Sequence, residues 1–389
     1  MENSTLISSF FLIFTGAAIL ASVALYTRQP LLVGYIVLGA LLGPYGMSWV
    51  SDTQLLGDIA QIGIIFLLFL LGLDMRPSNL INSLKQTTVV GILSSVLFAI
   101  CGYGTAIGFG FPHVESLIIG ISMVFSSTII GIKLLPTTVL HHRHTGELVI
   151  SILLLQDLIA IFVLLFLYGG ETGVIEWQVF AKSILVLPLL IIFAFGFVKY
   201  VLLHLIRRFD KFNEYIFLLA IGWCLGLAEF AEKMGLSLEI GAFIAGISVA
   251  TSPIALYIAN SLKPLRDFFL ILFFFSLGAG FNLGLLGEII IPATLLAIVM
   301  LAVKPTVFRA LLRKQSETNE LAWEIGFRLG QNSEFSLLIA YMAAASAVIG
   351  EEASHLIQAT AIITFLLSSY IVVFNYPTPI AISDKLRRD

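Results

Sequence analysis

Long apolar segments, separated by short polar stretches, follow one another along the chain. About twenty apolar residues in an α-helix span the roughly 30 Å hydrocarbon core of a bilayer. The pattern therefore predicts an all-α polytopic membrane protein with thirteen transmembrane helices. We place these helices at residues 6–26, 30–49, 56–74, 87–109, 115–137, 147–168, 178–203, 214–232, 236–257, 266–281, 286–309, 321–347 and 355–378.

The charges between these segments alternate in sign along the chain. Loops rich in Lys and Arg face the cytoplasm, so the alternation predicts an outside N-terminus, a cytoplasmic C-terminus and an odd number of helices. The basic set comprises Arg28; Arg76 and Lys85; Arg143; Arg207, Arg208 and Lys211; Lys263 and Arg266; Arg313 and Lys314; and Lys385, Arg387 and Arg388. The acidic set comprises Asp52 and Asp58; Glu115; Glu171 and Glu176; Glu229 and Glu232, with one Lys233; Glu288; and Glu351 and Glu352.

Two of the predicted helices contain polar residues and glycine at membrane depth, which indicates unwound backbone that lines a cavity. The fifth carries Ser122, Ser126, Ser127, Thr128, Gly131, Lys133 and Pro136, and the twelfth carries Gly330, Gln331, Asn332, Ser333 and Glu334. They are offset by seven helices, which is an odd number, so they cross the membrane in opposite directions. This predicts a single transport domain over residues 1–389, in which helices 1–6 (6–168) and 8–13 (214–378) are inverted repeats. The linker helix lies at 178–203.

Composition limits the classes of function. Of the 389 residues, 59% are hydrophobic and 12% are charged, which lies far outside the composition of soluble domains. The net charge of −3 argues against a nucleic-acid partner. We expect no separate soluble domain, no disulfide between Cys101 and Cys224, and a first helix that is retained rather than cleaved as a signal peptide. A transporter is expected rather than an enzyme, without a catalytic residue, resident cofactor or metal beyond the transported cation.

Asp157 lies near the centre of the predicted helix at 147–168. An intramembrane carboxylate is costly and is by default a candidate functional site. In a low-dielectric site it can exchange a proton for a cation near neutral pH. The alternative is a structural acid paired with a basic group in the bundle. Gln156 precedes it and offers a carbonyl oxygen in a supporting role.

Three hydroxyl residues of the fifth helix, Ser126, Ser127 and Thr128, are candidate cation ligands. Hydroxyl groups and backbone carbonyls are hard oxygen ligands that suit an alkali cation. The alternative is ordinary helix packing, in which Ser and Thr are common at helix contacts.

Four further charges lie at membrane depth. Lys304, followed by Pro305, could pair with Asp157, offset the dipole ends of the broken helices, or snorkel to the interface. Arg328 and Glu334 could bind each other or balance the crossing of the broken helices, with Glu324 one turn before Arg328. Lys133 could neutralise the first crossing or snorkel.

Two groups of residues mimic functional motifs. His141, His142 and His144 could suggest a metal site or a pH sensor, but a solvated cytoplasmic loop is the better interpretation, since no Cys or carboxylate set accompanies them. Gly102, Gly104, Gly108 and Gly110 do not match a dinucleotide fingerprint. The chain contains no TVGYG filter of the potassium-channel type.

Six stretches together resemble the second group of monovalent cation:proton antiporters, and within it the transmembrane domain of the glutathione-gated potassium-efflux type. They are FLLGLDMRP at 69–77, SSTIIGIKLL at 126–135, LLLQDLIAI at 153–161, LSLEIGAFIAGI at 236–247, LFFFSLGAGFNL at 272–283 and GQNSEFSLLIAY at 330–341. They follow the order of that family and span most of the chain.

The resemblance implies a thirteen-helix inverted-repeat fold in a homodimer, with a dimer domain and a mobile six-helix core that moves the ion by an elevator motion. It places the motif acid at Asp157, the motif glutamine at Gln156, the membrane lysine at Lys304 and the broken-helix hydroxyls at Ser127 and Thr128. It also implies a prokaryotic cell (inner) membrane.

The chain departs from relatives in two ways. A single carboxylate preceded by Gln, rather than two acids or Asn–Asp, suggests electroneutral exchange and favours K⁺ over Na⁺. Potassium-efflux members also carry a soluble nucleotide-binding regulatory domain after the last helix, whereas this chain stops at Asp389, so a separate soluble regulatory subunit is one expectation. The hypothesis is therefore K⁺/H⁺ exchange at Asp157. The alternatives are a gated channel-like pathway and an ion or pH sensor acting with a soluble partner.

Overall fold

The computed structural model describes residues 2–27, 29, 31–50, 53–74, 77–133, 144–168, 177–209 and 212–378. Seven of the described helices are long and apolar enough to cross a membrane, in agreement with the predicted membrane class. The elements are α1 (Glu2–Tyr26), α2 (Leu31–Leu42), α3 (Thr53–Asp74), α4 (Pro77–Gly108), α5 (His113–Ser122), α6 (Thr128–Lys133), α8 (His144–Tyr168), α9 (Trp177–Phe197), η1 (Val198–Leu202), α10 (Leu203–Arg208), α11 (Asn213–Lys233), α12 (Leu238–Ala250), α13 (Ala255–Ala279), η2 (Leu283–Leu285), α14 (Leu286–Lys314), α15 (Asn319–Arg328), α16 (Glu334–Ala345) and α17 (Glu351–Asn375).

One group of helices packs through small residues. Helix α3 lies against α12 and α13, α2 lies against α13 and α1, and α11 lies against α12. A Cβ at Gly39 would lie 2.0 Å from the carbonyl oxygen of Phe275, and a Cβ at Gly278 would lie 2.0 Å from that of Ile36. Glycine thus lets the backbones of α2 and α13 touch. Membrane helices associate through such close packing, because lipid is as apolar as their side chains and gives no hydrophobic driving force. We call α1–α3 and α9–α13 the first bundle.

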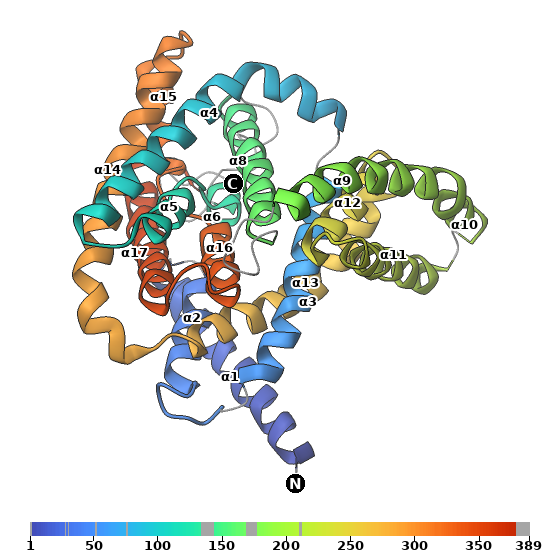
Figure 1. Cartoon of the computed structure of the whole chain (residues 1–389), viewed down its shortest axis with the longest axis horizontal. Coiled ribbons are helices and arrows are strands. Elements are labelled where there is room, and N and C mark those ends of the chain that lie inside the picture. Colours follow the sequence, from blue (N-terminus) through green and yellow to red (C-terminus); the bar gives the residue numbers. More distant parts are fainter. Residues whose placement is uncertain are drawn as a thin grey trace.

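A second group surrounds α8. Helix α4 packs on α5, α8 and α14, helix α14 packs on α15 and α17, and α16 packs on α5, α8 and α17. Its apolar interior includes Phe98 and Phe308, both fully buried, whose rings meet edge to face at 5.2 Å. Figure 1 shows α6 and α16 beside α8, with α4, α14 and α17 around them. We call α4, α5, α6, α8 and α14–α17 the second bundle.

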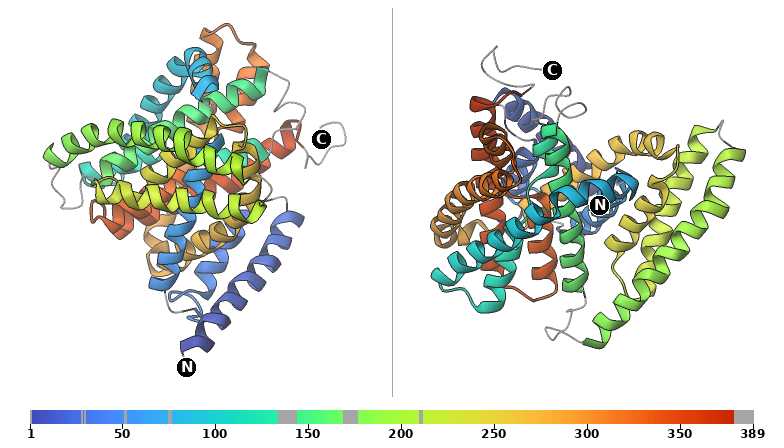
Figure 2. Two further views of the ribbon diagram at one scale, coloured as in Figure 1. Left: turned by 90° about the vertical axis from the view of Figure 1, so that its right-hand side faces the viewer. Right: turned by 90° about the horizontal axis from the view of Figure 1, so that it is seen from above.

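The two bundles differ in their place in the molecule. From above, the yellow-green helices of the first bundle extend away from the orange and red helices of the second (Figure 2). The predicted candidate site residues Asp157 and Lys304 lie on α8 and α14, so both belong to the second bundle.

Several predicted boundaries are wrong. The helix expected at 87–109 begins at Pro77, so part of the expected loop before it is helical, and the helix expected at 236–257 ends at Ala250. The helix expected at 30–49 ends at Leu42, because Gly43, Pro44 and Gly46 form a turn there. The loop expected between 257 and 266 is helical, since α13 begins at Ala255 and contains Lys263. Hydrophobicity reports where a helix meets lipid, not where it begins, so a polar first part of a helix is mistaken for a loop.

Candidate functional site

Two helix breaks meet in the second bundle. Residues 123–127 separate α5 from α6, and residues 329–333 separate α15 from α16, which confirms the two predicted interruptions. The hydroxyl of Ser126 donates to the carbonyl of Leu329 at 2.8 Å, and the Gln331 amide Nε2 donates to the carbonyl of Ser127 at 3.4 Å. The breaks, far apart in the sequence, are therefore bonded directly to each other.

Asp157 lies on α8 beside the first break and is 1% exposed. The Thr128 hydroxyl, at the first residue of α6, lies 3.4 Å from Oδ1 and 3.3 Å from Oδ2 of the carboxyl group. Glu334 lies within electrostatic range of it. Among the described residues no ion pair joins Asp157 to a basic side chain, so the structural acid–base pair that the sequence left open is not seen.

Gln156 holds the backbone of the first break. Its Oε1 accepts from the backbone N–H of Ser126 at 3.0 Å, and its Nε2 donates to the carbonyl of Val124 at 3.1 Å. Unwound backbone buried in a membrane protein requires such partners, because each unpaired polar group is costly. Gln156 thus contacts the backbone beside the carboxylate.

The three candidate hydroxyls have different partners. Ser126 bonds the second break, as described above, and the Ser127 hydroxyl accepts from the backbone N–H of Ile130 at 3.1 Å, where it caps α6. Of the three, Thr128 is the residue whose hydroxyl contacts the Asp157 carboxyl group. The sequence indicated this segment but not the different partners of its three hydroxyl groups, and their role as cation ligands stays a prediction.

Lys304 donates a hydrogen bond to a carbonyl group in each of the two breaks. Its Nζ donates to the carbonyl of Phe125 at 2.7 Å and to that of Gln331 at 3.0 Å, and it lies 5.6 Å from the centre of the Phe98 ring. These carbonyls follow α5 and α15, whose C-terminal ends carry partial negative charge. Of the three predicted roles, the structure places Lys304 at the dipole ends. Snorkelling is wrong because the side chain is fully buried.

Arg328 anchors the end of α15 to the segment after α17. Its guanidinium binds Glu324, with Nη2 at 2.7 Å and Nε at 3.0 Å from Oε1, and Nη2 donates to the carbonyl of Pro377 at 2.8 Å. Tyr376 packs against it at 5.9 Å. Burial raises the pKa of the Tyr376 hydroxyl, Glu324 raises that pKa further, and Arg328 lowers it.

The other predicted charges lie at the ends of the half-helices. Glu334 is the first residue of α16 and is buried, beside Ser333, whose side chain caps that helix. Asn332 donates to the sulfur of Met123, and Gly330 lies within the same break. Lys133 ends α6, and its side chain lies outside the described part of the structure.

Sequence reasoning missed the polar side chains of α17. The Thr364 hydroxyl accepts from the backbone N–H of Asn332 at 3.1 Å, and the Ser368 hydroxyl donates to Oε1 of Gln331 at 3.0 Å. Both are buried, as is Thr360 one turn earlier. A spacing of four residues puts all three on one face of a helix, and that spacing was the available signal.

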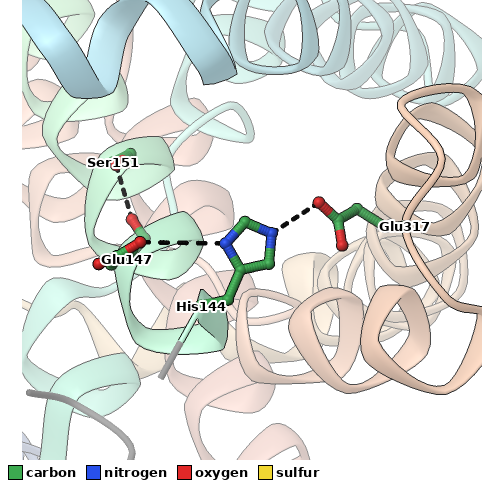
Figure 3. A network of polar contacts seen from close by, with 4 residues as sticks. All are labelled: His144, Glu147, Ser151 and Glu317. Carbon is green, nitrogen blue, oxygen red and sulfur yellow. Dashed lines mark hydrogen bonds and ion pairs between the residues drawn. The ribbon is translucent and has the colours of Figure 1, made fainter. Parts of the chain in front are cut away.

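His144 is exposed, as expected, but it belongs to a helix and not to a loop. It begins α8, and its Nε2 lies 2.7 Å from Glu317, while Nδ1 lies 3.9 Å from Glu147 (Figure 3). It therefore links the start of α8 to the turn between α14 and α15. His141 and His142 lie outside the described residues, and no metal-binding group of three ligands is found in the part that the structure describes.

Comparison with known proteins identifies sequence relatives. A family model described as "Sodium/hydrogen exchanger, transmembrane" matches residues 10–374. K(+) efflux antiporter 5 of Arabidopsis thaliana is 31% identical over 347 residues, which cover 86% of this chain and 60% of that protein. K(+) efflux antiporter 4 of the same plant is 31% identical over 322 residues, covering 80% and 54%. The chain thus spans little more than half the length of these relatives.

The fold also matches solved structures. The sodium proton antiporter MjNhaP1 from Methanocaldococcus jannaschii, at pH 8, superposes with a TM-score of 0.70 over 95% of this chain and 98% of that chain, at 16% identity. A second structure of that antiporter gives a TM-score of 0.59 at 18% identity. At these identities the similarity establishes the fold alone.

Proposed function

The chain belongs to the sodium/hydrogen exchanger family whose transmembrane model it matches, and on this premise we propose that it exchanges a monovalent cation for protons, with both competing for Asp157. The observation that carries the proposal is the buried Asp157 carboxyl group beside two helix breaks, with the Thr128 hydroxyl on it. A carboxylate in such a place must be neutralised by a proton or a cation. Either occupant fulfils this requirement, and their alternation is exchange.

The transported cation is K⁺ in our proposal, with Na⁺ as the other candidate. Two relatives are named K(+) efflux antiporters, whereas the matching solved structure is that of a sodium proton antiporter. The sequence relatives carry the preference, because they are closer in identity. One carboxylate then binds one cation or one proton in turn, which makes the exchange electroneutral.

The transport motion that we propose is an elevator in which the second bundle carries the ion past the first. The second bundle holds Asp157, Lys304 and both breaks, which supports its movement as one unit. Joining each pair of half-helices, and α9 through α10, would give thirteen crossings, with α1–α8 and α11–α17 as inverted repeats. A homodimer held by the first bundle completes this proposal.

The surroundings of the transporter are also part of the proposal. We place it in a prokaryotic inner membrane. The alternation of charge supports a topology with the N-terminus outside and the C-terminus in the cytoplasm. The greater length of the relatives leaves room for a soluble regulatory domain or separate subunit acting on this unit. No resident cofactor or metal is proposed beyond the transported ions.

The function is tested by proton flux in proteoliposomes. Vesicles containing a pH-sensitive dye receive a pH gradient and then KCl, NaCl, LiCl or choline chloride. We expect K⁺ to dissipate the gradient with wild type and not with Asp157→Asn, and clamping the voltage with valinomycin to change nothing. Exchange by Asp157→Asn at the wild-type rate would contradict the proposal.

The alternative functions give different results in related experiments. A channel-like pathway would show unitary conductance in a voltage-clamped bilayer without proton movement. A sensor would move neither cation nor proton but would bind a soluble partner.

A further inference from the structure

Ser368 differs from its neighbours in where its hydroxyl is directed. Ser and Thr inside helices commonly donate to a carbonyl of their own helix, and Ser369 and Thr364 do so, to Phe365 and Ala361, both at 2.8 Å. Ser368, 1% exposed, instead donates to the side chain of Gln331 in the second break at 3.0 Å. This bond joins α17 to the second break.

The Gln331 amide is held between two partners, of which Ser368 is one. An amide has an accepting oxygen and a donating nitrogen. The Ser127 carbonyl can only accept, so it takes Nε2 at 3.4 Å, and Ser368 donates to Oε1 on the other side of the amide. The side chain of Gln331 is fully buried, so water does not compete for either atom.

The bond from Gln331 to the Ser127 carbonyl connects the second break to the candidate ion site. It already accepts from the backbone N–H of Gly131 at 3.0 Å, in the first turn of α6. Gln331 is its second donor. The next residue, Thr128, places its hydroxyl on Asp157. The contacts therefore run from α17 through the second break to the start of α6 and to the carboxyl group.

We propose that Ser368 is a positioning residue of the cation site, which acts through Gln331 to hold the start of α6, and with it the Thr128 hydroxyl, against Asp157. It thereby sets the affinity for the cation and the preference between K⁺ and Na⁺, which differ in size and so respond to small changes in oxygen positions. This inference rests on the proposed exchange function. It assigns the affinity to a helix that, among the described residues, has no hydrogen bond of its own to Asp157.

The test compares Ser368→Ala with Ser369→Ala in the whole protein. Ser369 is an adjacent serine, equally buried at 1%, and its bond lies within its own helix. In proteoliposomes we expect Ser368→Ala to raise the half-saturating K⁺ concentration roughly three- to tenfold, as for loss of one hydrogen bond, and to change the K⁺/Na⁺ ratio. The maximal rate should stay within about twofold, and Ser369→Ala should match wild type.

A second readout and a third variant separate positioning from general damage. Thermal stabilisation of the purified protein by KCl should require the same three- to tenfold higher concentration for Ser368→Ala. In a Gln331→Met background, Ser368→Ala should have no further effect, because its partner is gone. Equal half-saturation in the two serine variants, or a loss of maximal rate alone, would overturn the inference.

Failure of the proposed function is visible separately. In that case wild type itself shows no cation-dependent proton flux and resembles Asp157→Asn, and the inference is overturned together with the exchange on which it rests. If wild type exchanges and Ser368→Ala is indistinguishable from it, the inference alone is overturned.

Discussion

Replacing Lys304 by methionine should loosen both helix breaks at once. The ammonium group donates to the carbonyls of Phe125 and Gln331, at 2.7 and 3.0 Å, and these carbonyls belong to the two breaks. Methionine fills a similar volume but cannot donate. The change therefore leaves two buried carbonyls without this partner and brings two negative helix ends together without a cation between them.

The magnitude follows from the two bonds. A hydrogen bond to a charged group contributes about 1.5–3 kcal/mol net. Because one donor serves both carbonyls, we expect the lower end of the sum, about 3 kcal/mol of lost stability. An unfolding entropy of about 0.8 kcal/mol/K, from the usual value per residue and a chain of 389 residues, converts this to a fall of about 4 °C in Tm.

The assay is thermal unfolding of purified protein, together with proton flux in vesicles. Thr306→Ala on the same helix is the control, since its hydroxyl is exposed and donates to carbonyls of its own helix at 2.6 and 2.9 Å. We expect the control to match wild type in both measurements. For Lys304→Met we expect at least a tenfold loss in the rate of exchange. A rise of about 1.4 kcal/mol in the activation free energy already gives that factor.

Two results would refute this reasoning. One is a Tm for Lys304→Met within 1 °C or so of wild type. The other is a loss of stability that disappears when Asp157→Asn is also present, because it would assign Lys304 to pairing with the carboxylate rather than to the carbonyls. The carbonyl role predicts the same loss in both backgrounds.

Two further predictions concern packing and the support of the first break. Gly278→Ala should lower stability by roughly 1–3 kcal/mol or more through overpacking, since its Cβ would lie 2.0 Å from a backbone oxygen. The control Gly222→Ala in α11 meets nothing within 4 Å and should raise stability by about 0.5–1 kcal/mol. Opposite or equal shifts in Tm would contradict the packing of α2 on α13. Gln156→Leu should lower the free energy of unfolding by about 2–6 kcal/mol and abolish exchange, because two backbone groups lose their partner. The control Gln358→Leu loses one bond to a serine hydroxyl and should lower it less. Equal Tm values for the two variants would show that the Gln156 bonds do not support the break.

Local sequence was enough to find the region of the site. The breaks were visible because glycine and clustered polar residues interrupt apolar helices, and Asp157 was visible because a carboxylate in a long apolar run has few ordinary explanations. Ser126, Ser127 and Thr128 lie in or next to the first break, and their role as cation ligands stays a prediction. Their separate roles were not predictable, since adjacent side chains of one segment point in different directions once the backbone unwinds.

The partners of Gln156, Lys304 and Ser368 could not be derived in the same way. Each bonds to a segment distant in the sequence, and a periodic pattern contains no information about which helix a given face will meet. Lys304 illustrates the difference, since its three predicted roles had the same sequence signature. Ser368 was overlooked because serine is common in membrane helices.

By itself, the sequence determined the membrane class, the positions of the two breaks and the candidate acid, because the cost of placing polar groups in hydrocarbon acts on each segment independently. Only the tertiary structure decided that the breaks bond to each other, that Lys304 donates to both of them, and that α17 bonds to the second break through Gln331. Those features depend on which helices pack together and in which direction their side chains then point, and packing is a property of the assembled bundle.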